Sequence, residues 1–359
     1  MNTANFEKKH FTEIRLLFIA CLGFILIIGM DRMYWGRDVL SEGLPNFSTG
    51  YLMRSSVIFM STLCLFLGLF GKNIVNNIKS NFDLDVSHGL SLERLSILAT
   101  PIFSLIFLLL FIADARSFNA LSLEDNALEW VSFLLLFICA IIFFLALLKK
   151  QYLINIPKFT KLSMLVIALG FFFISMEEIS WFQRVFNIDT PEMFVANIQH
   201  EMNFHNFATD VIENLYHFGA FLLLVALPFI RFLFPSITNN NYFKLFIPRP
   251  FIAIVGSIAC AYNFDMWNII FTQIAYIGSL LILLTFLKFS AHEFERYTIV
   301  FTIFIIIATQ ITFLLNGERF ARLWEVTEYK EFFIALAYLI YAIDINVSIR
   351  RVYYAKIIQ

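Results

Sequence analysis

Ionisable residues gather in one stretch of an otherwise apolar chain, from Glu177 to His217. Two adjacent carboxylates, Glu177 and Glu178, end an apolar run, and His205 follows within the same stretch. Carboxylates and imidazoles exchange protons near neutral pH, so these residue types favour general acid and base catalysis. We predict Glu177, Glu178 and His205 as the catalytic groups, with either glutamate as the base and His205 as its proton partner.

The same stretch offers groups that could bind a substrate. Arg184 is suited to clamp an anion, and Asn203 and Asn206 are suited to bind hydroxyl groups. The spacing of 3, 4, 3 and 4 residues from Asn203 to His217 predicts one polar helical face, which must turn away from lipid. The predicted substrate-binding residues are Gln183, Arg184, Glu201, Asn203, Asn206, Asp210, Glu213 and His217.

Charge pairing is the structural alternative to chemistry here. Arg184 lies seven residues after Glu177, on the same face of a continued helix, and is predicted to compensate that acid. Glu201 and His205, four residues apart, form a second predicted pair. In the alternative, Glu177 or Glu178 simply locks neighbouring helices through an ion-pair network.

A metal site does not follow from the histidines. His200 and Glu201 with His205 give the spacing His-Glu-x3-His, which differs from the zinc signature His-Glu-x2-His. We therefore predict no metal ligands, and the sequence identifies no cofactor.

The elements that position these residues are set by lipid. The 359 residues are 60% hydrophobic and only 15% charged, with long apolar runs between short polar loops. This pattern predicts an all-α, polytopic helical membrane protein forming one integral membrane domain, residues 1–359. About ten spans are predicted, at 16–30, 52–70, 96–113, 130–148, 162–180, 211–230, 246–262, 267–287, 298–315 and 331–347. Asp189-Thr190-Pro191 predicts a short surface helix between spans five and six, from about Pro191.

Basic residues predict the orientation. With the N-terminus inside, 18 of the 26 Lys and Arg residues lie in cytoplasmic segments, so both termini are predicted to be cytoplasmic. All five tryptophans then fall at the outer ends of spans, where indoles sit well between headgroups and acyl chains. The polar segment at about 177–217 is therefore predicted to be extracytoplasmic.

Four short runs resemble the signature of an uncharacterised family of bacterial multi-spanning membrane proteins. They are Glu177-Glu178-Ile179-Ser180-Trp181, Gln183-Arg184, Thr190-Pro191 and Glu201-x-Asn203-x-His205-Asn206. Phe182 and His200 stand where that signature has glycines. The resemblance implies a multi-pass protein of the bacterial cytoplasmic (inner) membrane and implies no activity.

Three function classes fit these observations. The first is a membrane-embedded enzyme, a transferase or hydrolase with an outward-facing polar site, acting on a lipid-linked or cell-envelope glycan substrate. The second is a proton-coupled transporter, which polar residues on several spans would favour. The third is a non-catalytic membrane assembly protein. Membrane lipids are the expected partners and nucleic acid is not, while the sequence specifies no oligomeric state.

Overall fold

The computed structural model describes residues 3–76, 91–123, 125–149, 156–197 and 200–357, and this described part is helical without β-strands. Ten of its segments are long and apolar enough to cross a membrane, which confirms the predicted fold class. They are α1 (Thr3–Tyr34), α2 (Thr49–Asn76), α3 (Leu92–Ala113), α5 (Ala127–Leu148), α7 (Lys158–Glu178), α8 (Thr209–Phe221) continued by η5 (Leu222–Ala226) and α9 (Leu227–Leu233), α10 (Asn241–Phe246) followed by α11 (Pro250–Ser257) and η7 (Ile258–Ala261), α12 (Ile270–Phe289), α13 (Glu293–Leu315) and α14 (Glu325–Ile357).

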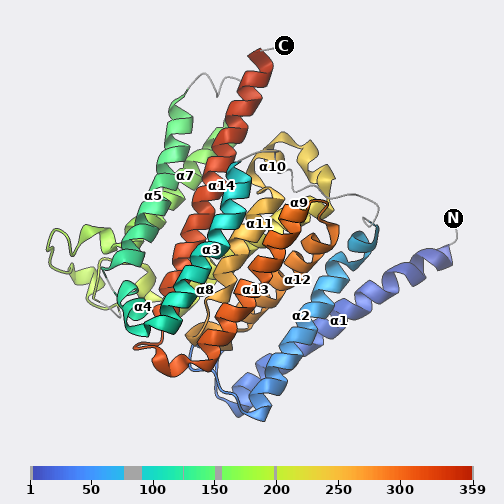
Figure 1. The fold of residues 1–359 in the computed structure, drawn as a ribbon, viewed down its shortest axis with the longest axis horizontal. Coiled ribbons are helices and arrows are strands. Elements are labelled where there is room, and N and C mark those ends of the chain that lie inside the picture. The colour runs from blue at the N-terminus through green and yellow to red at the C-terminus, as the bar shows by residue number, and fades with distance from the viewer. Residues whose placement is uncertain (1–2, 77–90, 124, 150–155, 198–199, 358–359) are drawn as a thin grey trace.

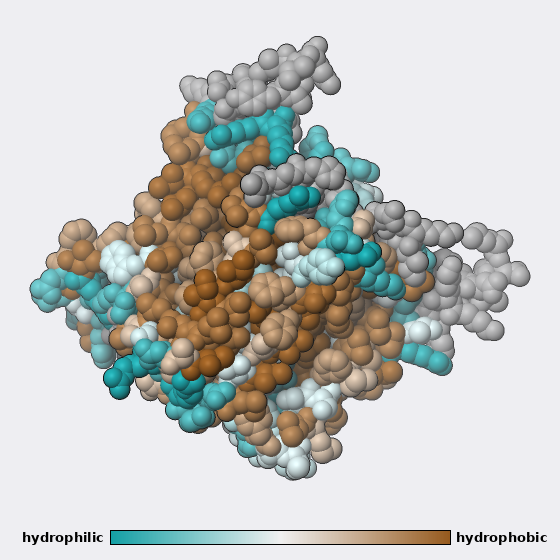
Figure 2. All heavy atoms as spheres, in the orientation of Figure 1, coloured by the Kyte–Doolittle hydropathy of each residue, from teal (hydrophilic) through white to brown (hydrophobic). Residues whose placement is uncertain are grey.

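The spans run side by side in one bundle (Figure 1). The start of α1, the end of α14 and helix α10 lie at one end, whereas α4 (Ala115–Leu121) lies at the other. We refer to these as the inner and outer ends. Figure 2 shows a broad hydrophobic surface across the middle of the molecule, as a lipid-facing surface requires. The α1–α2 hairpin packs against α12, and the α5–α7 pair packs against α14.

The seventh span consists of two short helices instead of one long helix. Pro248 and Pro250 interrupt helix formation between α10 and α11, because proline lacks the amide hydrogen that a helix needs. The twelve residues of α11 and η7 then cover only about 18 Å of the roughly 30 Å of hydrocarbon. The chain continues through a buried non-helical segment and the short turn η8 (Asp265–Asn268) before α12 begins. Such backbone is tolerated at this depth only where protein or a cavity surrounds it.

Two buried arginines connect the spans, one near each end. Near the inner end, Arg249 donates to Asp344 of α14 at 3.0 Å and to Glu93 of α3 at 2.6 Å. Near the outer end, Arg54 of α2 donates to Asp31 of α1 at 2.5 Å and to the carbonyl of Asn268 at 2.7 Å. Both arginines are structural, because their partners belong to neighbouring helices and all are buried.

The surface helix predicted from about Pro191 is present as a single 3-10 turn, η3 (Glu192–Phe194). A second such turn, η4 (His205–Phe207), precedes α8. The segment between spans five and six therefore consists of turns, and its shape must come from side-chain hydrogen bonds.

Candidate functional site

Helix α7 ends at Glu178, and a tight turn follows. Ser180, Trp181 and Phe182 have φ angles of 46°, 55° and 60°, in the left-handed region that non-glycine residues rarely adopt. The prediction that Glu177 and Arg184 share one helical face is therefore wrong, because helix α7 ends before Arg184. Three consecutive strained residues persist only where surrounding contacts hold them.

Glu177 supplies those contacts. Its carboxylate accepts hydrogen bonds from the Trp181 indole at 2.6 Å, the Phe204 amide at 2.7 Å and the His205 amide at 3.2 Å. Asn203 donates to the Glu177 carbonyl at 2.9 Å. Both carboxylate oxygens are satisfied and the side chain is buried, so Glu177 ties the end of α7 to residues 203–205.

His205 lies beside this carboxylate, with Nδ1 3.9 Å from Glu177 Oε2. The structure thus brings two of the three predicted catalytic residues together. Burial lowers the pKa of His205, and the nearby Glu177 charge only partly opposes this. Burial therefore favours the neutral form of the ring.

Arg184 pairs with other acids than predicted. It contacts Asp125 at 2.6 Å and also pairs with Glu201, whose second oxygen accepts from the Ser180 hydroxyl at 2.5 Å. The predicted pair of Glu201 with His205 is wrong, because the chain between them is not helical and Arg184 takes the carboxylate.

The amides of the segment bind its own backbone. Gln183 donates to the Thr190 hydroxyl at 2.9 Å and accepts from the Met202 amide at 2.6 Å. Asn197 donates to the carbonyls of Glu201 and Asn203 at 2.6 and 3.1 Å. The signature residues therefore hold this turn segment in shape.

The predicted five-residue polar stripe is only partly helical. Asn203 and Asn206 are buried and precede α8, which begins at Thr209. Only Asp210, Glu213 and His217 occupy the helix. Asp210 is exposed near its start, whereas His217 is buried deeper in the bundle.

A second polar group, the Lys330 cluster, lies beneath this segment. We define it as Glu178, Glu213, His217, Asn263, Gln310, Lys330 and Glu331. Lys330 is 5% exposed and donates to Asn263 at 2.8 Å. Asn263 and Gln310 exchange two hydrogen bonds, of 3.1 and 2.6 Å. The cluster therefore joins α7, α8, α13, α14 and the non-helical segment after η7.

Carboxylates surround the lysine. His217 Nε2 lies 3.2 Å from Glu331 Oε1, and Glu213 and Glu331 both act electrostatically on Lys330. The charges of Glu331, Glu213 and two further outer-end acids, Glu129 and Glu328, act electrostatically on Glu178. In the described part of the chain, the Glu178 side chain makes no hydrogen bond, in contrast to its neighbour Glu177.

The cluster lies within the membrane-spanning helices. Lys330 is five residues inside α14 and His217 eight residues inside α8, which correspond to depths of about 8 and 12 Å. Ionisable groups at this depth are costly and usually functional.

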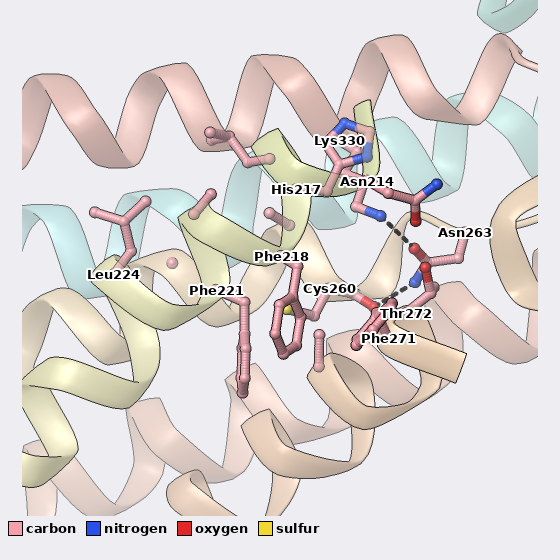
Figure 3. A pocket seen from close by; sticks show the side chains of 15 residues that line it. Asn214, His217, Phe218, Phe221, Leu224, Cys260, Asn263, Phe271, Thr272 and Lys330 are labelled. Carbon is pink, nitrogen blue, oxygen red and sulfur yellow. Dashed lines mark hydrogen bonds between the residues drawn. The ribbon is translucent and has the colours of Figure 1, made fainter. Parts of the chain in front are cut away.

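A small cavity adjoins the cluster (Figure 3). Its volume is about 20 Å³, enough for one water molecule, and its lining includes Lys330, His217, Asn214 and Asn263. Figure 3 shows these polar side chains at one end of the cavity and Leu224 and Phe221 at the other. Leu224 belongs to η5, a π-helical turn, and such turns are frequent at functional sites.

Two acids extend the cluster toward the outer loops. Burial and, secondarily, Asp265 and Asp210 raise the pKa of Glu42 from 4.5 to about 7. Burial likewise raises the pKa of Asp265 to about 6. Both groups therefore titrate close to physiological pH.

The sequence patterns missed Lys330, Glu331, Asn263 and Gln310. The predicted span 331–347 begins one residue after Lys330 and so leaves this lysine outside the membrane. The available signal was Trp324-Glu325, which marks the helix start and places Lys330 more than one turn inside α14. Asn263 and Gln310 had no local signal, since each is a single polar residue in an apolar run.

Within the described residues, no group of three or more His, Cys, Asp and Glu side chains is arranged to hold a metal ion. No protein-family model, curated protein or solved structure matches the chain. The family resemblance of the signature residues therefore stays a prediction.

Proposed function

We propose that this protein is a proton-coupled membrane carrier whose Lys330 cluster binds and releases the coupling proton. The observation that carries the proposal is Lys330 itself, a buried lysine inside a membrane span with Glu213, Glu331 and His217 as neighbours. One positive charge among several carboxylates stabilises only some of them as anions, so the others hold protons that can be exchanged.

The interrupted seventh span supports a carrier. Transporters commonly place their binding sites where a helix is broken near the middle of the membrane. Here, η7 ends just before Asn263, and this asparagine directly accepts the Lys330 hydrogen bond. A change in lysine protonation would therefore act on backbone that is not fixed by helical hydrogen bonds.

Glu177 is less suited to carry the proton than Glu178. Three donors already satisfy the Glu177 carboxylate, and protonation would break at least one of these bonds. Glu178 has no such bonds and faces other acids of the cluster.

The proton-binding step can be tested without knowing the solute. Infrared difference spectra of the protein in liposomes, recorded as pH is varied, report protonated carboxyl groups directly. We expect Glu331→Gln and Glu213→Gln each to remove part of the protonated-carboxyl band, while Glu192→Gln, an exposed acid of the outer segment, leaves it unchanged. An identical band in all four proteins would refute the proposal.

The coupling step is tested in the same liposomes with a pH-sensitive dye inside. Solutes from several chemical classes are added under a pH gradient, and we expect solute-dependent proton entry that Glu331→Gln lowers at least about tenfold. Loss of entry in Glu192→Gln, or entry that no solute alters, would contradict a coupled carrier.

A second candidate is the enzyme predicted above, acting on a lipid-linked or envelope-glycan substrate at the outer surface. The specific observation in its favour is the half-buried His205 beside Glu177, since burial favours its neutral imidazole and a neutral imidazole can act as a base. Turnover of such a substrate that His205→Gln abolishes and Glu331→Gln leaves intact would favour this candidate. For either function, we propose a bacterial cytoplasmic membrane with both termini in the cytoplasm.

A further inference from the structure

A large open pocket lies at the outer end, away from the Lys330 cluster. Helix α4, the turn η9 (Gly317–Arg319) and the start of α14 form it, with a volume of about 510 Å³. This volume is within the range of small-molecule sites, roughly 300–1,000 Å³. Three arginines line it, Arg116, Arg319 and Arg322, with one acid, Glu325.

Two of the arginines are held in place by contacts with the protein, and each still has N–H donors that can bind a ligand. Arg319 donates to the Ile112 carbonyl at 3.1 Å and lies over the Phe111 ring at 5.1 Å. Arg322 donates to the Ser122 carbonyl at 3.1 Å and lies 3.6 Å from Glu325. A guanidinium has five N–H donors, so each retains several for a ligand.

The third arginine is exposed. Among the described residues, no hydrogen bond or ion pair involves the Arg116 side chain, which reaches the same pocket from α4. Three guanidinium groups against one carboxylate leave a net positive pocket, suited to an anion with several acceptor oxygens.

A further polar atom points to a built site. Asn119, 9% exposed, donates to the Arg319 carbonyl at 3.0 Å, which fixes its orientation. Its Oδ1 atom is buried without a hydrogen-bond partner in the described part of the chain. An unsatisfied buried acceptor costs stability, so the pocket wall keeps a polar group that the fold itself does not require.

The pocket's surroundings place it at the membrane interface. Ile112, Leu315 and Trp324, which are 49%, 68% and 48% exposed, lie at the adjoining ends of α3, α13 and α14. Tryptophan favours the headgroup level and exposed aliphatic side chains face acyl chains. A ligand with both a phosphate and a hydrocarbon chain fits both surfaces.

We propose that this pocket binds a phosphate group, presented at the outer interface by the headgroup of an anionic lipid. The three arginines hold the phosphate oxygens, and Asn119 fixes the Arg319 backbone at the pocket wall. The site shares no residue with the Lys330 cluster, so the proposal of a phosphate site does not depend on proton coupling.

Calorimetric titration of the purified full chain in a neutral detergent tests the proposal. The probes are short-chain phosphatidylglycerol, inorganic phosphate and a short-chain diacylglycerol, which lacks phosphate. We expect phosphatidylglycerol to bind at least about tenfold more tightly than phosphate, and diacylglycerol not to bind measurably. Equal binding of phosphatidylglycerol and inorganic phosphate would support a phosphate site and identify the source as a solute.

Variants separate this site from general charge effects. Arg116→Gln, whose exposed side chain leaves the fold intact, is expected to weaken phosphatidylglycerol binding about tenfold. Arg319→Lys retains the charge but loses the planar fork, and is expected to weaken it as well. The matched control Arg32→Gln removes an exposed outer arginine that is paired with Asp38 and should change nothing. Unchanged affinity in both pocket variants, or no binding of either phosphate-containing probe, would overturn the proposal.

Discussion

At the scale of single residues, Glu177 and Glu178 show how neighbours in sequence acquire different roles. Successive helical side chains point about 100° apart, so the two carboxylates leave α7 in different directions. One meets an indole and two backbone amides, and the other faces the acids around Lys330. The first is a structural anchor, and the second belongs to the cluster that we propose to exchange protons.

Glu42 provides a test of this electrostatic environment. Its raised pKa means that the folded state holds the proton more tightly than the unfolded state. The stability it contributes is therefore present below its unfolded pKa of about 4.5 and is lost as pH rises through about 7. The groups that face it are Asp265, Asp210, Lys330 and Glu213.

Glu42→Gln, which mimics the protonated acid, should match the parent protein's Tm at pH 4.5 and exceed it by about 2 °C at pH 8. Thermal unfolding in detergent across this range measures the difference. Glu318→Gln, an exposed outer glutamate, serves as the control and should show no trend with pH. A Glu42→Gln advantage that is largest at low pH would contradict the assigned direction.

At the scale of elements, side-chain hydrogen bonds replace regular structure wherever the chain leaves a helix. The α1–α2 hairpin shows this at its outer end, where Arg54 contacts Asp31 and the carbonyl of Asn268. Asn268 in turn donates to the Gly43 carbonyl at 2.6 Å. Much of the α1 surface is exposed, as expected of a lipid-facing helix. This polar contact therefore positions the hairpin against α12.

Breaking the ion pair between Arg54 and Asp31 should lower the free energy of unfolding. Asp31→Asn leaves Arg54 charged and buried, and we expect it to lower the free energy of unfolding by about 3 kcal/mol in chemical denaturation. Arg32→Gln breaks only an exposed pair and should cost less than about 0.5 kcal/mol. In Asp31→Leu with Arg54→Met, which removes both charges, much of the loss should be recovered. Equal stability of Asp31→Asn and the parent would show that the hairpin is held by apolar packing alone.

At the scale of the whole molecule, paired buried charges and unbalanced buried charges lie toward opposite ends of the bundle. The Arg249 group near the inner end is a closed set of paired ions, whereas the Lys330 cluster toward the outer end has more acids than bases. Both chain ends lie at the inner end, and all five tryptophans adjoin the outer ends of spans. The Lys330 cluster thus lies nearer the end that carries the tryptophans than the end that carries the chain termini.

Cysteine labelling tests the orientation. In a variant with its four native cysteines replaced, Asn46→Cys lies in an exposed outer loop and Ser236→Cys in an exposed inner one. A membrane-impermeant maleimide added to intact bacterial cells should label Asn46→Cys, and should label Ser236→Cys only after permeabilisation. The excess of basic residues at the inner end is the physical reason. The opposite labelling pattern would reverse the orientation of the protein.

The sequence by itself determined the spans, because each must bury some twenty apolar residues in lipid whatever its neighbours are. It also located the polar segment from Glu177, and it placed Glu177 and His205 in one site. It could not show that Glu178, Glu213 and Lys330 belong to one electrostatic cluster, since they lie on three different spans and their proximity depends on how the helices pack. The left-handed turn after Glu178 was likewise decided by tertiary structure, because only the carboxylate of Glu177 and its three donors hold a turn that local preference disfavours.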